Sequence, residues 1–229
     1  LGFIIGPAIG GILGEYGPRV PFFAAACISI LNVAYGYLVL PETLPRESRR
    51  PFSLARSNPI GVFKVFATYR QALPLCIVMA MYFFATSVYP AIWAFWGIAR
   101  FNWSEMTIGW TLSVFGLITA VVQGGLTGPA VKWLGERNTT ILALATSVIA
   151  AAGYGVATGM SMVLILFLVH APEGFAQPAL TALMSKDAPP DAQGELQGGI
   201  ASAQNLALLV GTVMFAQIFG YFLQDGSPI

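Results

Sequence analysis

The chain has 229 residues, of which 56% are hydrophobic and only 9% are charged. Soluble domains carry about a quarter charged residues, so this composition excludes an ordinary soluble protein and indicates a polytopic helical membrane protein. A net charge of +1 also excludes the broad basic field that binds nucleic acid. Both cysteines, Cys27 and Cys76, lie in apolar runs, and we expect buried free thiols rather than a disulfide.

Uncharged runs long enough to cross a bilayer follow one another along the chain. A hydrocarbon core of about 30 Å needs about 20 apolar residues in a helix. Residues 1–13 are too few and indicate the second half of a helix. Complete spans are predicted at residues 20–40, 71–99, 106–131 and 196–224, and the run 138–185 is divided into two more by Gly159-Met160-Ser161. The predicted fold is therefore all-α, with one partial and six complete membrane helices.

A basic loop at residues 41–70 separates two blocks of this apolar sequence. It holds six of the eleven basic residues, which places it on the cytoplasmic side by the positive-inside rule. Threading the helices from this loop also places residues 132–137 and 186–195 in the cytoplasm. Nine basic residues then lie on the cytoplasmic side, and only Arg19 and Arg100 on the other.

The chain begins inside an apolar, glycine-rich run, without an initiator methionine or a signal peptide. We therefore expect it to be a fragment of a longer protein.

The first helix carries the pattern G-x3-G-P-x2-G-G, formed by Gly2, Gly6, Pro7, Gly10 and Gly11. Glycines at this spacing open a smooth groove for close helix packing, and a proline bends the helix because it removes a backbone hydrogen bond. The pattern resembles the end of the antiporter signature in the fifth helix of the major facilitator superfamily. A generic glycine-rich packing helix is the alternative.

A second pattern begins in the last part of the span 106–131 and ends at residue 137. It resembles the second-half version of the superfamily's cytoplasmic loop motif, with Gly128 in the place of the usual acid. An ordinary cytoplasmic turn is the alternative. The residues of this loop motif are Gly124, Leu126, Gly128, Lys132, Gly135 and Arg137.

A wider resemblance covers nearly the whole chain. Residues 93–137, Pro51-Phe-Ser-Leu and Asn58-Pro59 of the loop, and residues 193–198 are similar to the tetracycline-efflux proteins. The resemblance implies a twelve-helix drug/proton antiporter, of which this chain would supply helices five to eleven. Residues 1–40 would end the N-terminal half, the segment 41–70 would join the halves, and residues 71–229 would form the C-terminal half without helix twelve.

Two positions depart from that family. Its ninth helix carries an intramembrane aspartate, where this chain has Ser147, and a histidine of its eighth helix corresponds to Thr119. The resemblance therefore implies that two family groups tied to proton or drug–metal handling are missing.

His170 and Glu173 are the only ionisable residues deep in the apolar spans. Residues three apart share one face of a helix. A charge at the bilayer centre costs about 2.5–3.5 kcal/mol on insertion scales, so such residues usually mark a transport pathway. The hypothesis is that Glu173 exchanges a proton coupled to transport, with His170 as its partner or as a substrate contact. Alternatively, the helix is shifted and both lie in water near the outer interface.

Aromatic residues gather on the span 71–99. Tyr89 and Trp93 are four residues apart and share a face, on which a planar hydrophobic drug could stack. We expect Trp96, Trp103 and Trp110, near the outer end, to belong to the interfacial aromatic belt.

Uncharged polar residues within the spans are further candidates for the substrate cavity. Gln177 lies between Pro172 and Pro178, and prolines bend the broken helices that line transporter sites. Each such residue contacts either the substrate or a neighbouring helix. The others are Asn32, Gln123 and Asn205.

The patterns favour an efflux transporter, with a small-molecule substrate, the lipid bilayer and the missing helices of a longer chain as partners. The resemblance implies that its membrane is the bacterial inner membrane. An uptake permease of the same fold for a small metabolite and a non-transporting fragment are the alternatives. One histidine does not build a multi-histidine metal centre, and the sequence has no P-loop or nucleophile elbow. We therefore expect no enzymatic activity, no metal and no cofactor, with the proton gradient as the energy source.

Overall fold

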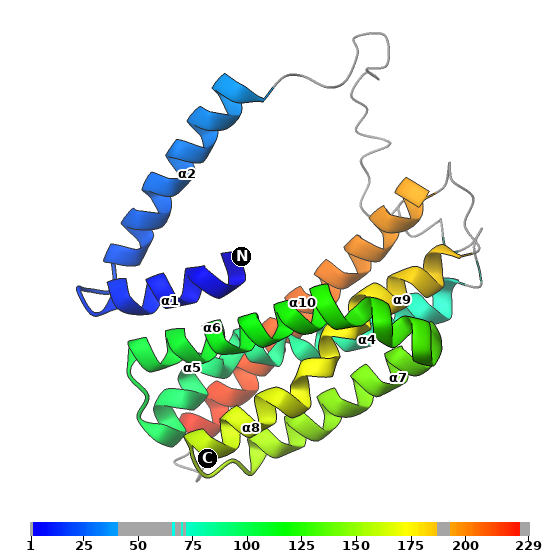
Figure 1. Ribbon diagram of the computed structural model, residues 1–229. Coiled ribbons are helices and arrows are strands. Elements are labelled where there is room, and N and C mark those ends of the chain that lie inside the picture. Colours follow the sequence, from blue (N-terminus) through cyan, green and yellow to red (C-terminus); the bar gives the residue numbers. More distant parts are fainter. Residues whose placement is uncertain (1, 41–65, 67–69, 71, 187–192, 225–229) are drawn as a thin grey trace. The chain divides into compact units, whose positions relative to one another are not determined.

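The computed structural model describes residues 2–40, 66, 70, 72–186 and 193–224 (Figure 1). These residues form helices and no strand, which confirms the predicted all-α fold. The helices are α1 (Gly2–Gly14), α2 (Val20–Val39), α4 (Ala72–Thr86), α5 (Val88–Phe101), α6 (Glu105–Val121), the π-helix η3 (Val122–Leu126), α7 (Thr127–Gly155), α8 (Met160–His170), the 3₁₀-helix η4 (Ala171–Phe175), α9 (Ala176–Ser185) and α10 (Gln193–Gln224).

Five helical stretches of the described chain are long and apolar enough to cross a membrane, where the sequence predicted six. The difference lies in the stretch Glu105–Gly155, whose 51 residues hold two predicted spans. No loop separates them. Instead, a single residue interrupts the helix: Gly135 has φ 76° and ψ 160°, a conformation that side chains with a Cβ rarely adopt. The predicted cytoplasmic turn is therefore a helix broken at Gly135.

The described chain packs as two units. One contains residues 2–40 and 104–113, and the other contains residues 66, 70, 72–103, 114–186 and 193–224. Most of the loop 41–70 lies outside the described residues. The division into two six-helix halves joined by that loop therefore stays a prediction.

In the first unit, glycines bring α1 against the start of α6. A Cβ added to Gly109 would lie 2.5 Å from the Pro7 carbonyl oxygen, and one added to Gly11 would lie 3.1 Å from the Glu105 carbonyl oxygen. The predicted antiporter motif thus contributes Pro7 and Gly11 to this contact. The Cβ positions of its glycines 6 and 10 meet open space, and the surroundings of residue 2 lie outside the described side chains.

In the second unit, α10 packs against α4 and α5, while α7 packs against α8, η4 and α9 (Figure 1). Buried apolar residues of α4, α9 and α10 form one core cluster, centred on Met79, Leu180 and Leu196. A second cluster joins η3, α7 and η4 and includes Val122, Ala143 and Phe175. These clusters hold η4 and its neighbours in place between α4 and α7.

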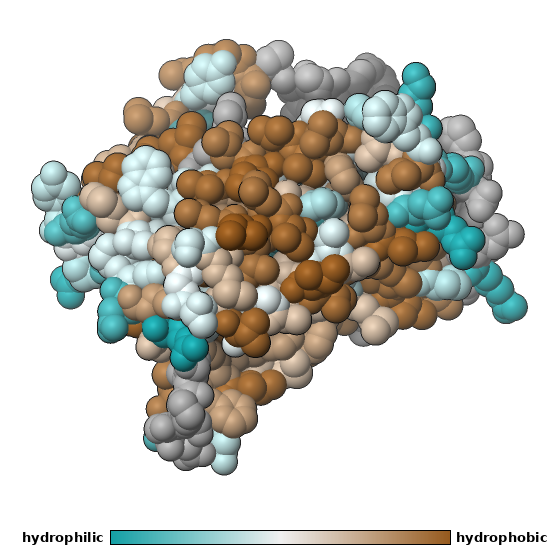
Figure 2. Space-filling view, turned by 60° about the horizontal axis from the view of Figure 1, so that its bottom comes forward, coloured by the Kyte–Doolittle hydropathy of each residue, from teal (hydrophilic) through white to brown (hydrophobic). Residues whose placement is uncertain are grey.

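The outer surface is strongly apolar. No residue of α2 is buried, and Phe22, Leu31 and Tyr37 are each more than two-thirds exposed. Figure 2 shows hydrophobic residues across the middle of one face, with hydrophilic residues gathered toward its ends. A surface of this kind is stable in lipid and would aggregate in water. The chain is an integral membrane protein.

The two cysteines differ in their surroundings. Both are free, as predicted. Cys76 is buried in the α4 core, but Cys27 is exposed, and the prediction of burial was wrong for it because α2 has no buried face.

An ion pair joins two segments that were both predicted to be cytoplasmic. Lys186 Nζ lies 2.9 Å from Glu136 Oε1. The hydrogen bond from this ammonium group holds the pKa of the Glu136 carboxyl below its usual range, so the contact is present at neutral pH and is lost on acidification. The end of α9 and the Gly135 break therefore lie at the same end of the second unit.

The Gly11–Gly109 contact predicts opposite effects for two matched substitutions in the full-length protein. Alanine favours a helix over glycine by about 1 kcal/mol, so Gly6→Ala should leave the thermal unfolding midpoint in detergent unchanged or raise it. Gly109→Ala should lower that midpoint, because its Cβ would press on the Pro7 carbonyl oxygen. Equal midpoints for the two variants would show that α1 does not lie against α6.

The threading predicts which ends of the helices reach the cytoplasm. In a background without native cysteines (Cys27→Ser, Cys76→Ala), we expect Gly159→Cys to react with an impermeant maleimide on intact cells. Lys186→Cys should react only after the membrane is permeabilised. Labelling of position 186 on intact cells would contradict the predicted orientation.

Candidate functional site

The buried ionisable pair lies where helix α8 gives way to η4. His170 ends α8, and Pro172 stands in the first turn of η4. Proline has no N–H for the α-helical hydrogen bond, which favours a change to the tighter 3₁₀ form, in which residues three apart lie directly in line. Glu173 is thereby aligned with His170, and its Oε2 forms an ion pair with His170 Nε2. The two residues are only 1% and 8% exposed, so neither lies in water.

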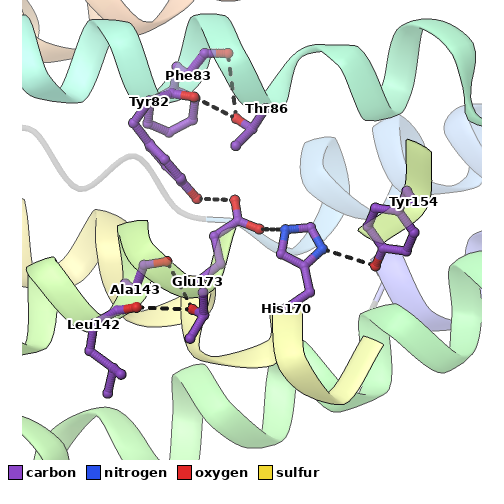
Figure 3. Close-up of polar contacts among 9 residues, drawn as sticks. Tyr82, Phe83, Thr86, Leu142, Ala143, Tyr154, His170 and Glu173 are labelled. Atoms are coloured by element: carbon purple, nitrogen blue, oxygen red, sulfur yellow. Dashed lines mark hydrogen bonds and ion pairs between the residues drawn. The ribbon is translucent and has the colours of Figure 1, made fainter. Parts of the chain in front are cut away.

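Two tyrosines extend this pair into a continuous chain of polar contacts (Figure 3). The Tyr82 hydroxyl, from α4, donates a hydrogen bond of 2.7 Å to Glu173 Oε1. The Tyr154 hydroxyl, from α7, lies 3.2 Å from His170 Nδ1. We refer to Tyr82, Glu173, His170 and Tyr154, in this order, as the polar chain.

The polar chain satisfies groups that would otherwise be costly to bury. A carboxylate in an apolar bundle is stable only with a partner and with hydrogen bonds to its remaining lone pairs. Glu173 Oε1 accepts a hydrogen bond from Tyr82, and His170 Nδ1 shares one with Tyr154. Glu173 Oε2 and His170 Nε2 contact each other as an ion pair, but Nε2 makes no hydrogen bond within the described residues. The Tyr154 hydroxyl can either donate to Nδ1 or accept from it, so the contact fits more than one protonation state of the imidazole.

Aromatic rings enclose the imidazole of His170. Its centroid lies 4.9 Å from the ring of Tyr89, 5.0 Å from Phe115 and 5.7 Å from Tyr154. These rings come from α5, α6 and α7, and together they leave little room for water at the sides of the imidazole.

A cavity of about 510 Å³ lies beside the polar chain, between α5, α7 and α10. Tyr89 and Trp93 both line it, as expected for a shared face, and Tyr154 connects it to His170. Arg100 is the one charged residue among those that line it. The complete lining consists of Ala85, Val88, Tyr89, Ile92, Trp93, Trp96, Arg100, Ala151, Tyr154, Gly155, Phe215 and Phe219.

Trp93 is the centre of an aromatic cluster on one side of this cavity. Its ring lies 5.2 Å from Trp96, 5.4 Å from Tyr154 and 5.7 Å from Phe167. Trp103 joins the same cluster and is only 8% exposed, although we predicted it in the interfacial belt.

Two local features place Trp103 there. Asn102 has φ 55°, which reverses the chain at the end of α5, and the Trp103 N–H then donates to the Gly97 carbonyl. The indole consequently lies against Gly97, at a position that any Cβ would occupy. Trp110 is half exposed and remains compatible with the belt.

The predicted polar candidates are not brought to this cavity. Gln177 on α9, Gln123 on η3 and Asn205 on α10 are all exposed, as is Asn32 on α2 in the other unit. None of them lines the cavity.

The loop motif is distributed over η3 and the first part of α7. Gly124, Leu126, Gly128, Lys132 and Arg137 are exposed, and only Gly135 has a conformation that requires glycine.

The two positions that depart from the tetracycline-efflux family lie at different distances from the polar chain. Thr119 packs against the segment of Glu173: a Cβ added to Gly174 would lie 3.5 Å from Thr119 Cγ2. Its Oγ1 is buried and makes no hydrogen bond within the described part of the chain. Ser147 is half-buried on α7.

Sequence reasoning missed Tyr154 altogether and noticed Tyr82 only as an aromatic residue. The available signal was a tyrosine between two glycines, Gly153-Tyr154-Gly155, in an apolar span. A Cβ at Gly153 would collide with Leu166, so this glycine lets α7 approach α8 closely enough for the hydroxyl to reach Nδ1. Phe215 and Phe219 had no distinguishing signal, because apolar residues fill the whole of α10.

The Major Facilitator Superfamily model matches residues 1–212, nearly the whole chain. The chain belongs to the Major Facilitator Superfamily. The family match confirms the resemblance that the glycine motifs indicated in the sequence.

Several relatives of this Major Facilitator chain are drug-resistance proteins. It is 32% identical to the tetracycline resistance protein, class C, of Escherichia coli over 96% of its own length, and 29% identical to multidrug resistance protein 2 of Bacillus subtilis over 98%. It is also 24% identical, over 96% of its length, to the mouse hippocampus abundant transcript 1 protein, of which it covers 46%. The chain spans 55% of the length of the two bacterial relatives. The resemblance to tetracycline-efflux proteins is confirmed.

The Tyr82–Glu173 hydrogen bond predicts a stability difference between two matched variants. Hydrogen bonds to charged groups contribute about 1.5–3 kcal/mol, so Tyr82→Phe should lower the unfolding midpoint by leaving Glu173 Oε1 unsatisfied. Tyr221→Phe removes a hydroxyl from a tyrosine that is 63% exposed and should leave the midpoint unchanged. Thermal unfolding of the purified full-length protein tests this, and equal midpoints would contradict the contact.

Proposed function

We propose that the protein to which this chain belongs exports a planar hydrophobic compound, such as tetracycline, in exchange for protons. One observation carries the proposal: a buried carboxylate–imidazole pair is joined by a hydrogen bond to the wall of an aromatic cavity. The names of the bacterial relatives, which concern tetracycline and multidrug resistance, support export of a drug.

The position of Glu173 supports proton coupling. Replacing a buried ion pair by apolar residues is often neutral or stabilising, so stability alone is a weak reason to keep one in a membrane bundle. Glu173 also lies in the segment that packs against Thr119, the position to which the resemblance assigns a histidine of the tetracycline-efflux family. We infer that η4 supplies the ionisable group that Thr119 and Ser147 lack, with Glu173 carrying the proton and His170 assisting it.

The cavity supports a planar, largely apolar substrate. Drug-sized ligands occupy cavities of about 300–1,000 Å³ lined mainly by apolar and aromatic side chains. Tyr89, Trp93 and Phe215 line the cavity with aromatic rings, and Arg100 stands at its edge near the end of α5. These features favour a substrate with an aromatic plane.

The exposed amides suggest where the rest of the longer protein lies. Gln123, Gln177 and Asn205 are exposed on helices that are otherwise apolar, and lipid offers them no hydrogen bonds. We assign them to the surface that faces the remaining helices, across the central pathway that alternating access requires. On this proposal those helices are the chain's partner, and a bacterial inner membrane, as in the bacterial relatives, is its location.

Drug accumulation in cells that express the full-length protein tests the proposal. Lower accumulation of tetracycline or of another planar drug, restored when the proton gradient is collapsed, is the expected result. Faster entry of a small metabolite would instead support an uptake permease, and no effect on any compound would support a non-transporting protein.

The proton-carrying role predicts a specific loss. Glu173→Gln should reduce pH-driven export to background while retaining substrate exchange without a gradient, because the amide is isosteric but does not ionise. Glu15→Gln, at an exposed position, serves as the control and should keep both activities. Transport assays in proteoliposomes measure both, and normal pH-driven export by Glu173→Gln would remove this residue from the mechanism.

A further inference from the structure

The polar chain has one end in the aromatic cavity, and that end is Tyr154. Its hydroxyl contacts His170 Nδ1, and the same side chain lines the cavity. Tyr89 also lines the cavity and contacts the imidazole, but only through its ring, without a hydrogen bond in the described part of the chain. Phe115, on the α6 side, has no group that moves a proton. Tyr154 is thus the polar link between cavity and imidazole within the described residues.

We propose that Tyr154 is the cavity-side end of a proton relay to Glu173, and that a ligand in the cavity closes this relay. This inference deepens the proposed function. The use of the relay in transport rests on that function, whereas the relay itself does not. The assignment of Tyr154 comes from the contacts of α7 with α8.

The relay moves one proton and conserves charge. A hydronium ion in the cavity gives a proton to the Tyr154 oxygen, while Tyr154 passes its own hydroxyl proton to Nδ1 of the neutral imidazole. His170 then passes its Nε2 proton to Glu173 Oε2. The two atoms are in contact as an ion pair, and Nε2 makes no hydrogen bond within the described residues, so the carboxylate turns into line with the Nε2–H bond for this transfer. The products are water, an intact tyrosine, a neutral imidazole protonated on Nδ1, and a neutral carboxylic acid. The reverse sequence returns the proton to the cavity.

The Tyr82 end of the polar chain has a different role from the Tyr154 end. Tyr82 donates to the other carboxylate oxygen, Oε1, and holds Glu173 in place for the transfer. Its own backbone carbonyl accepts a hydrogen bond from Thr86, which stays within α4. Tyr82 therefore positions the proton acceptor and does not line the cavity.

The cavity geometry links ligand binding to the relay. The rings of Trp93 and Tyr154 meet edge to face with centroids 5.4 Å apart, and both line the cavity. A planar ligand that fills the cavity therefore contacts both rings and displaces the water that would supply Tyr154 with protons. Substrate and proton then exclude each other at one tyrosine, which is the requirement for exchange of one for the other.

Exchange of the His170 ring protons with water measures the relay directly. His170 is the one histidine of the sequence, so ¹⁵N-histidine labelling reports on it, and loss of the signal in His170→Gln assigns it even if the longer protein holds others. We expect Tyr154→Phe, which keeps the ring, to slow this exchange at least about tenfold, the equivalent of losing one hydrogen-bonded step of about 1.4 kcal/mol. Tyr221→Phe removes the hydroxyl of an exposed tyrosine on α10 that does not line the cavity, and it should leave the exchange rate unchanged.

The outcomes separate the relay from transport. Unchanged exchange in Tyr154→Phe, or equal slowing in Tyr221→Phe, would overturn the relay, whatever the protein transports. Slowed exchange in a protein that moves no drug would support the relay and count against the proposed export. Tetracycline at saturating concentration should slow exchange in the wild type but not further in Tyr154→Phe. If it does not slow the wild type, closure of the relay by that drug is wrong.

Discussion

The need to keep one carboxylate and one imidazole stable inside an apolar bundle determines most of this site. Glu173 and His170 are almost fully buried, and no water-exposed face is available to either. The protein supplies their partners from distant parts of the chain, Tyr82 from α4 and Tyr154 from α7. Because these contacts must form together, the positions of four helical segments are tied to one another around the pair. The aromatic cavity is lined in part by α4 and α7, so its shape depends on the positions of these helices.

Close helix packing through small residues makes these contacts possible. Gly153 admits Leu166 of α8, and Gly174 admits Thr119 of α6. On the opposite side, a Cβ on Gly211 would lie 2.7 Å from the Phe84 carbonyl oxygen, which brings α10 against α4. In lipid, helices gain little from burying apolar surface against one another, so such backbone approach is a main source of packing energy. The site therefore depends on glycines that carry no chemistry themselves.

The sequence predicted what depends on local pattern and missed what depends on tertiary contact. Hydropathy and charge located the spans, and three-residue spacing placed His170 and Glu173 on one face. The same reasoning had no means to pair Tyr154 with His170, because that contact is set by the approach of α7 to α8. It also expected a loop where a broken helix turns at Gly135, since only backbone geometry distinguishes the two. Amides such as Gln177 were assigned to the cavity by their polarity, but which way a helix faces is decided by its neighbours.

The buried ionisable group of this chain is at Glu173, and not at Thr119 or Ser147, where the resemblance expects ionisable residues. Its location bears on how proton transfer could be coupled to transport. In the tetracycline-efflux family the resemblance places the ionisable groups on the eighth and ninth helices. Here Glu173 lies in η4 and His170 at the end of α8, where Pro172 begins the 3₁₀ segment. A 3₁₀ segment has fewer favourable hydrogen bonds than an α-helix and rearranges at low cost. The contact between Glu173 and His170 joins this segment to the end of α8. A break held by one polar contact is a point at which a change in that contact alters the course of a membrane helix.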